Sequence, residues 1–523
     1  MAEYDYVIVG AGSAGCVLAN RLSADPSRRV LLLEAGGSDK KMEVKVPAAF
    51  SKLFRTEHDW DHNAEPDPNL KGRSLYIPRG KMLGGSSSMN AMIYIRGRRY
   101  DYDTWERMGA KGWSYDEVLP YFRRSEHNET IQDEYHGVAG ELNVSDLRDP
   151  NPLTTMFIDA GVAAGFERNP DFNGAYQDGF GYFQVTQKRG ARHSTATAFL
   201  RPAAGRPNLT VETGAFTTRI LFDGNRAIGV EYRRNDRSME AHATAEVIVA
   251  AGAINSPQLL LLSGVGPADE LRGHGIPVVV NAPQVGANLQ DHPAILQIWE
   301  SKLKVSMHLA EKPKQLLKYL ALRKGMLTSN VAEAGGFVHT RPGLPAADIQ
   351  FHFGPAYYAD HGFETHDGHA FTLGPVLVSP ESRGTIRLRS ANPDDKPEIT
   401  GNYLAAQSDM DAMVEGLKIG REIAAAGPFD EARGREIYPG SDFTTDAELE
   451  EFVRQKVALL YHPSGTCAMG KADSAVVDPE LRVYGTEGLR VVDASVMPIV
   501  TGGNTNAPTI MIAEKASQTI VAG

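Results

Sequence analysis

The sequence predicts a mixed α/β protein (α+β overall) with two domains, and four stretches of its 523 residues support this. Residues 4–34 have the order strand, glycine turn, helix and strand, which is typical of a nucleotide-binding unit. Residues 246–262 and 489–521 each show another strand that leads through small residues into a helix. Residues 299–458 contain short runs in which apolar and polar residues alternate, as in strands, and these runs are separated by clearly predicted helices. We therefore expect a discontinuous Rossmann-like domain and a second domain with a mainly antiparallel sheet flanked by helices.

The first turn has the glycine spacing of a dinucleotide-binding motif. Gly10, Gly12 and Gly15 form G-x-G-x-x-G between the apolar run 7–9 and a predicted helix. The first glycine permits the tight turn, the second lets a pyrophosphate approach the backbone, and the third packs the helix on the strand. Glu34 ends the next strand, where a carboxylate can accept hydrogen bonds from a ribose hydroxyl. The motif alone leaves NAD and FAD open as alternatives.

The same patterns predict where the domains begin and end. The nucleotide-binding domain is expected to comprise 1–155, 201–298 and 459–523, with a substrate-side segment at 156–200 and a substrate-binding domain at 299–458. The last part would carry the catalytic residues. Within the substrate-binding domain, residues 312–324 predict an amphipathic, basic helix that would cover a cleft or lie on the surface, and we favour the surface.

Composition excludes several classes of protein. The net charge of -11 argues against nucleic acid as a partner. Two cysteines, Cys16 and Cys467, exclude a disulfide framework and fit a reducing compartment. There is no secretory signal pattern and no apolar run of about 18 residues, so we expect a cytoplasmic protein without a transmembrane segment. No metal site is expected, and a homo-oligomer remains open.

Four separated stretches resemble the glucose–methanol–choline (GMC) oxidoreductases, a family of flavoenzymes. The glycine motif with Glu34 is shared by many flavoproteins, whereas the glycine- and serine-rich stretch 80–90 looks like the first family signature. By composition alone, that stretch would be a flexible loop as readily as a binding loop. Residues 252–266 look like the second signature, and residues 462–466 with Asn506 resemble the catalytic segment. The resemblance spans the chain in the expected order and implies FAD rather than NAD.

The resemblance also implies which residues hold FAD. The predicted cofactor-binding residues are Gly10, Gly12, Ser13, Ala14, Gly15, Glu34, Ala35, Met82, Gly84, Gly85, Ser86, Asn90, Ala91, Ala251, Asp493, Ala494, Asn504 and Thr505. Some family members tether FAD through a histidine at the position of Met89. Because a thioether is not a nucleophile for that reaction, we expect non-covalent FAD. Cys16 is expected to be a small buried residue in the first helix.

By the same resemblance, His462 and Asn506 would be the catalytic residues. Alcohol oxidation requires loss of the hydroxyl proton and transfer of hydride to flavin N5. A histidine suits the proton step because its ordinary pKa is about 6.5, and an asparagine can hold the same oxygen. We predict oxidation of a primary alcohol to the aldehyde, with oxygen, a quinone or another electron acceptor reoxidising the flavin. Whether His462 is itself the base stays open, and other histidines, including His292, are expected on the surface or in the core.

The substrate is less well specified than the reaction. Glu333, Trp60 and Tyr461 resemble the choline-dehydrogenase-like branch, where a glutamate with aromatic walls can hold a quaternary ammonium. His352 is a fourth candidate because it lies in an aromatic run. Residues 300–455 contain no second tryptophan for an aromatic cage, so we prefer an aliphatic or aryl alcohol, with choline as the alternative. A further alternative is a relative with a non-redox outcome, namely a fatty acid photodecarboxylase or a cyanohydrin lyase.

Overall fold

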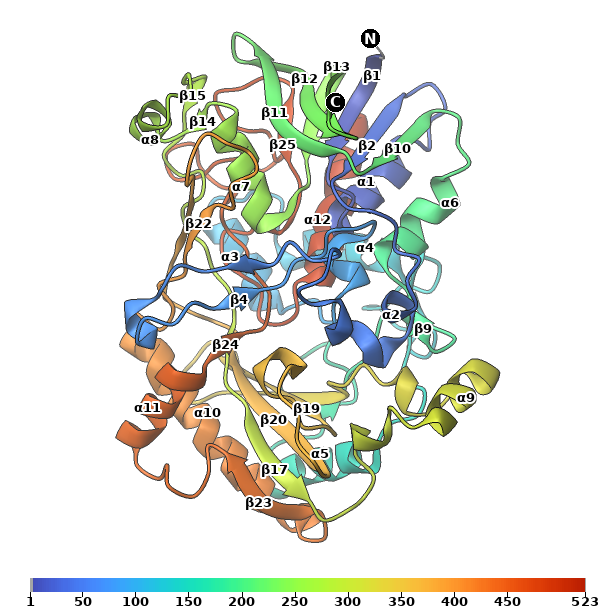
Figure 1. Cartoon of the computed structure of the whole chain (residues 1–523), viewed down its shortest axis with the longest axis vertical. Coiled ribbons are helices and arrows are strands. Elements are labelled where there is room, and N and C mark those ends of the chain that lie inside the picture. Colours follow the sequence, from blue (N-terminus) through green and yellow to red (C-terminus); the bar gives the residue numbers. More distant parts are fainter. Residues whose placement is uncertain (1–2, 523) are drawn as a thin grey trace.

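Two large sheets organise the chain, one in each half of the molecule (Figure 1). The structure is a computed structural model that describes residues 3–522. The structure confirms the mixed α/β class predicted from the sequence. Among the described residues, no helix is both long and apolar enough to cross a membrane.

The first sheet combines strands from three distant parts of the chain. Its order is β10 (Leu209–Thr213), β2 (Val30–Glu34), β1 (Glu3–Val9), β13 (Arg237–Val249), β12 (Arg226–Arg234) and β11 (Phe216–Asp223), and β25 (Leu489–Val491) also pairs with β13. The pairs β10–β2, β2–β1, β1–β13 and β13–β25 are parallel, and Val247 faces both Val7 and Leu489 in register. The central strands have buried apolar runs without alternation, namely 7–9 of β1, 30–33 of β2 and 247–249 of β13, because both faces of a parallel sheet are covered.

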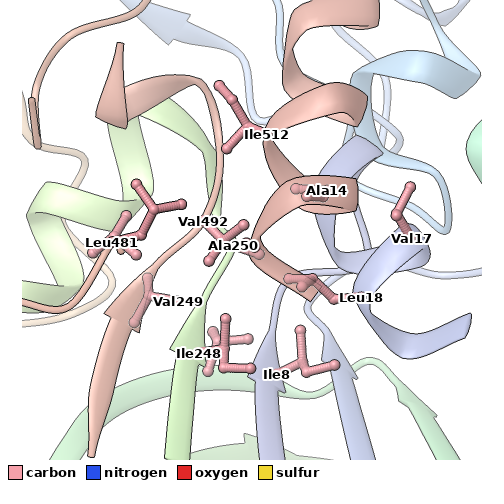
Figure 2. Close-up of a cluster of buried hydrophobic side chains, with 14 of the residues drawn as sticks. Ile8, Ala14, Val17, Leu18, Ile248, Val249, Ala250, Leu481, Val492 and Ile512 are labelled. Carbon is pink, nitrogen blue, oxygen red and sulfur yellow. The ribbon is translucent and has the colours of Figure 1, made fainter. Parts of the chain in front are cut away.

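The first and last helices of the chain cover this sheet together. Helix α1 (Ser13–Leu22) packs against α12 (Asn506–Ala522), and both contribute to the largest hydrophobic core. Figure 2 shows Leu18 of α1 and Ile512 of α12 with Ile8 and Ile248 of the strands. The start of α12 therefore lies close to the glycine turn, although almost 500 residues separate them along the chain.

The second sheet is antiparallel. Its order is β23 (Arg433–Tyr438), β17 (Gln297–Ser301), β20 (Ala370–Leu377), β19 (Ile349–Gly354), β18 (Ala334–Val338) and β7 (Gly179–Tyr182), with β16 (Pro293–Ala294) and β24 (Ala458–Leu459) joined beside β20. Helices α5 (Pro152–Ala163) and α10 (Gln407–Ala425) pack against it. Stacked rings fill this second core, such as Phe157 on Phe353 with centroids 4.6 Å apart.

The remaining elements are short. The helices are α2 (Met42–Lys45), α3 (Arg99–Arg107), α4 (Tyr115–Ser125), α6 (Arg201–Ala203), α7 (Gly252–Leu262), α8 (Ala268–Gly273), α9 (Pro313–Leu322) and α11 (Asp446–Lys456). The paired short strands are β3 (His62–Asn63) with β4 (Tyr76–Ile77), β5 (Glu126–Asn128) with β6 (Leu142–Val144), β8 (Gln187–Lys188) with β9 (Ala191–Arg192), β14 (Val265–Gly266) with β15 (Val280–Asn281), and β21 (Thr385–Arg387) with β22 (Glu398–Thr400). Helix α9 projects at the side of the lower half (Figure 1).

Candidate active site

The glycine motif forms the turn between β1 and α1. Gly10 has a φ of +99°, which favours glycine, and a Cβ there would lie 2.5 Å from the carbonyl oxygen of Ala250. A Cβ at Gly15 would lie 1.8 Å from the carbonyl oxygen of Gly10, so α1 packs directly on the turn. A Cβ at Gly12 would meet no atom within 4 Å, and this residue lines a cavity. The backbone at Gly12 is therefore open to a ligand.

The first turn of α1 presents its backbone amides to the same cavity. Its N-cap residue is Gly12, and no side chain of the described residues caps the helix there. Free amides and the helix dipole at such an end favour an anionic group such as a pyrophosphate. Ser13 Oγ donates a hydrogen bond of 2.7 Å to Asn506 Oδ1, which links α1 to the start of α12.

Glu34 lies beneath this turn at the end of β2. Its carboxylate accepts hydrogen bonds from Ala11 N at 2.9 Å and Gly36 N at 2.8 Å. Burial raises the pKa of Glu34 to about 7, although the residue still lines the cavity. A carboxyl group retains acceptor capacity beyond two hydrogen bonds, which suits contact with a ribose hydroxyl.

One cavity of about 700 Å³ has both the glycine turn and His462 in its wall. The predicted site residues that line it are Gly10, Gly12, Ser13, Ala14, Glu34, Ala35, Gly85, Ser86, Asn90, Ala91, Ala251, Asp493, Ala494, Asn504, Thr505, Asn506, Trp60, His352, Tyr461 and His462. Four predicted residues lie outside the lining, namely Gly15, Met82, Gly84 and Glu333. Gly84 N donates to Ala11 O at 2.7 Å, and Gly85 N donates to Met82 O at 2.8 Å, so both support the loop.

The residues of this cavity fit a dinucleotide cofactor such as FAD. A Cβ at Gly12 would project into the open space, and one at Gly85 would lie 2.7 Å from Gly12 Cα, so glycine keeps both segments close to the ligand space. Asp493 accepts hydrogen bonds from Gly252 N at 2.9 Å and Ser256 Oγ at 2.6 Å. It thereby holds the start of α7 against the segment that lies between His462 and α12 in the chain.

His462 lies between a second histidine and an asparagine. Its Nδ1 lies 3.0 Å from His292 Nδ1, and its Nε2 lies 3.3 Å from Asn504 Nδ2. Since an amide nitrogen can only donate, Nε2 of His462 accepts and carries no proton. The proton of the neutral ring is then on Nδ1, which donates to His292 Nδ1. His462 Nε2 thus presents a lone pair toward Asn504 at the cavity wall.

Asp291 fixes the backbone around this pair. Its Oδ1 accepts hydrogen bonds of 2.7 Å from both His462 N and His292 N. Burial raises the pKa of Asp291 to about 7, while the nearby Arg79 guanidinium opposes that shift. Arg79 also donates to the carbonyl oxygen of Tyr461. Asp291 and Arg79 therefore both bond to the backbone of the segment that carries His462.

The histidines of the site are neutral near pH 7. Burial holds the pKa of His462 well below its ordinary value, and so do the charge repulsion that its protonated ring would meet from a protonated His292 and the positive charge of Arg79. Burial lowers the pKa of both His292 and His352 to about 3. A neutral imidazole with a free Nε2 lone pair can accept a proton from an alcohol.

The structure brings Asn504, rather than Asn506, to His462. Asn504 had been predicted as a cofactor-binding residue, and its Oδ1 accepts a hydrogen bond of 3.2 Å from Gln350 Nε2. Asn506 instead bonds Ser13 at the glycine turn, as described above. Both asparagines line the cavity, but their side chains contact different ends of the site.

Sequence reasoning missed His292 and Asp291 as parts of the site. His292 had been expected on the surface or in the core, and it is fully buried. The signal present in the sequence was the adjacent acid–histidine pair followed by Pro293. That pair became informative only when the fold placed it next to His462.

Glu333 does not lie in the cavity lining, although it had been expected to face the substrate. Its carboxylate is buried and accepts hydrogen bonds from Asn151 N at 2.8 Å, Thr154 Oγ1 at 2.6 Å and Ser329 Oγ at 2.5 Å. Two donors at the start of α5 and the hydroxyl of Ser329 therefore occupy this group. A role as anion for a quaternary ammonium does not fit this placement.

Trp60 lines the cavity away from His462. Its ring stacks on His62 with centroids 6.1 Å apart and lies 6.0 Å from Phe216, and the Lys81 ammonium lies over it. Phe216 begins β11, and the preceding residue, Ala215, donates its backbone N–H to the carbonyl oxygen of Glu34 at 2.8 Å. Trp60 therefore lies on the nucleotide side of the cavity.

Aromatic rings surround the cavity near His462. Tyr461 lies edge-on to Phe54 at 5.8 Å, Phe54 lies 5.9 Å from Phe50, and Phe50 lies 6.4 Å from Tyr358. The hydroxyl of Tyr461 is hydrogen-bonded to Nδ1 of His361, so the polar end of Tyr461 has a partner. This wall offers apolar surface to the carbon chain or ring of a substrate.

The fold and the site together define a dinucleotide-binding oxidoreductase with a histidine beside the cofactor cavity. Family models described as GMC oxidoreductase match residues 4–294 and 380–513. The chain belongs to the GMC oxidoreductase family, as the resemblance in its sequence implied.

Relatives and solved structures agree with this family. The chain is 48% identical to the alcohol dehydrogenase (acceptor) of Pseudomonas putida, over 99% of this chain and 96% of that one. It is 46% identical to the mitochondrial choline dehydrogenase of Mus musculus, over 99% and 89%. The structure matches pyridoxine 4-oxidase from Mesorbium loti with a TM-score of 0.91 and 32% identity, covering all of both chains. It matches FAD-containing formate oxidase of Aspergillus oryzae RIB40 with a TM-score of 0.93 and 28% identity, over 100% and 98%. Family and neighbours support an oxidoreductase with FAD.

Proposed function

We propose that this chain oxidises a neutral primary alcohol to the aldehyde, with non-covalent FAD and with His462 as the proton acceptor. The observation that carries the proposal is the neutral His462 ring, whose Nε2 lone pair lies at the cavity wall while Nδ1 is bonded to His292. Bound FAD would supply the hydride acceptor at flavin N5. The relative named alcohol dehydrogenase (acceptor) supports the same reaction class.

The proton step uses the chain's own groups. The alcohol hydroxyl would replace the direct contact between His462 and Asn504, donate its proton to His462 Nε2 and accept a hydrogen bond from Asn504 Nδ2. The negative charge that develops on the substrate oxygen is then stabilised by an amide donor. Because the side chain of Asn504 is already held by Gln350, this donor is oriented before the substrate arrives. Asn506 would hold the glycine turn and the cofactor.

The non-covalent state of FAD follows from the side chain at the tether position. Met89 is buried and lines the cavity, and its thioether cannot form the bond that a histidine forms. Acid precipitation should therefore release the flavin into the supernatant. Flavin that remains with the protein pellet would contradict this part of the proposal. The electron acceptor, the cytoplasmic location and a homo-oligomer stay predictions.

The neutral alcohol is preferred because aromatic rings rather than Glu333 surround the space near His462. Choline remains the second candidate, since relatives at 46% identity are named choline dehydrogenase. An anaerobic panel of 1-octanol, benzyl alcohol and choline, scored by flavin bleaching, separates the two. Bleaching by choline alone would reject the neutral-alcohol proposal, and no bleaching by any alcohol would reject the reaction.

Site variants test the assigned roles. With FAD retained, His462→Ala should slow flavin reduction by about 10²-fold or more, which is the size of a general-base contribution. Asn504→Ala should slow the same step, whereas Asn506→Ala should mainly weaken FAD retention. A wild-type rate of single-turnover flavin reduction in His462→Ala would refute the assignment of His462 as the proton acceptor. The opposite pattern in the two asparagine variants would return the catalytic role to Asn506.

A further inference from the structure

Helix α9 has its apolar face directed to solvent. Leu317, Leu320 and Leu316 are 67%, 50% and 43% exposed, and only Tyr319 of this helix is buried. These leucines stand at i, i+1 and i+4, so they share one face of the helix. A surface helix of a globular protein normally turns that face toward the core. Helix α9 is inverted in this respect.

Basic side chains frame the exposed leucines. Lys314 and Lys318 follow them around the helix, and the flanking basic residues are Lys312, Arg323 and Lys324. The turn between β8 and β9 lies against the end of α9 and adds Lys188 and Arg189 to the basic residues. The closeness is shown by Gly190 in that turn, where a Cβ would lie 2.8 Å from the carbonyl oxygen of Arg323 and 3.3 Å from the side chain of Arg148. Figure 1 shows β9 close to α9.

The neighbouring acids are paired already. Asp149 forms an ion pair with Lys318, with an N–O distance of 3.0 Å, and Glu311 forms one with Lys52 at 2.9 Å. The surface around α9 therefore has a positive balance, while the whole chain has a net charge of -11. A positive patch on an acidic protein attracts a negatively charged partner locally.

We propose that α9 is an interfacial anchor that lies on an anionic lipid bilayer. Its leucine face would enter the boundary between head groups and acyl chains, and the basic residues would contact anionic head groups. An anionic bilayer offers an apolar interior to the exposed leucines and negative head groups to the basic residues beside them. Residues 323–331 connect α9 through the short helix Met326–Thr328 to Val331 in the cavity wall. The anchor would therefore hold one side of the cavity near the membrane surface.

Vesicle flotation of the FAD-loaded full chain tests the anchor. Vesicles of equal parts phosphatidylcholine and phosphatidylglycerol should carry the protein, and pure phosphatidylcholine vesicles should carry at least tenfold less. Replacing Leu316, Leu317 and Leu320 together by Gln should lower binding to the mixed vesicles by tenfold or more, because the apolar area that enters the bilayer is lost. Lys314→Gln with Lys324→Gln should lower it further and reduce its salt dependence.

A matched triple variant controls for general changes in surface polarity. Val162, Met239 and Val521 are also exposed apolar residues, on other elements, and replacing all three by Gln should leave vesicle binding unchanged. Alcohol oxidation with a soluble dye should be unchanged in both triple variants, which separates anchoring from failure of the proposed reaction. Equal flotation of the α9 variant and the wild type would overturn the proposal. The proposal would also be overturned if the wild type did not bind vesicles but formed a dimer, and the triple variant of α9 were a monomer.

Discussion

Removing the acceptor at His292 should slow the chemical step without emptying the site. In His292→Ala the Nδ1 proton of His462 loses its partner in a fully buried position. An unpaired buried donor costs about 1–3 kcal/mol, so the tautomer with a free Nε2 lone pair becomes less favourable by up to that amount. At about 1.4 kcal/mol per tenfold, flavin reduction should fall by about 5- to 150-fold.

His292→Asn provides the matched control. Asparagine carries its Oδ1 at the same number of bonds from the backbone as histidine carries Nδ1, so this variant keeps an acceptor for His462. Anaerobic stopped-flow reduction with a saturating alcohol should show near wild-type rates in His292→Asn and slow rates in His292→Ala. The acidic limb of the pH profile should also move to higher pH in His292→Ala, because His292 helps to lower the pKa of His462.

Two results would refute this reasoning. Equal rates in His292→Ala and the wild type would show that the contact does not select the tautomer of His462. Equal losses in His292→Ala and His292→Asn, with FAD content and melting temperature unchanged, would show that the hydrogen-bond acceptor is not what matters.

The other predictions concern the cofactor turn, the pH profile, Glu333 and Asn504. Gly15→Ala should destabilise the fold by about 2 kcal/mol or more because its Cβ meets the turn, whereas Gly12→Ala should fold normally but lose FAD affinity; thermal melts and flavin content distinguish them. As pH falls, kcat/KM for an uncharged alcohol should show no inflection near 6.5, because the lowered pKa of His462 keeps the base neutral there. Glu333→Gln should lower the melting temperature yet change choline and octanol oxidation alike, and a loss confined to choline would contradict the buried role. Asn504→Ala should lower kcat more than it raises KM, since its amide acts mainly on the developing charge.

Local sequence was sufficient for the nucleotide end of the molecule. In residues 4–34 every element follows the previous one directly, so spacing alone relates the turn to Glu34. Gly10 and Gly15 have neighbours at which a side chain would collide, and Gly12 faces open space, as the motif predicts. The mixed α/β class could also be predicted, because apolar runs and alternating runs mark buried parallel and half-buried antiparallel strands.

The reacting end needed the tertiary structure. His292 and His462 are 170 residues apart, and no local pattern relates a histidine after β15 to one after β24. Asn504 and Asn506 differ by only two positions, and which of them faces His462 depends on how the start of α12 is held by Ser13 of α1.

The sequence by itself determined the family, the fold class and the glycine turn, and it selected His462 as the catalytic candidate. Only the tertiary structure decided the partners of that histidine, the burial of Glu333 beneath α5 and the outward direction of the leucines on α9. The physical reason is that periodicity defines which residues share a face of an element. Packing against distant elements decides whether that face meets core, cavity or solvent.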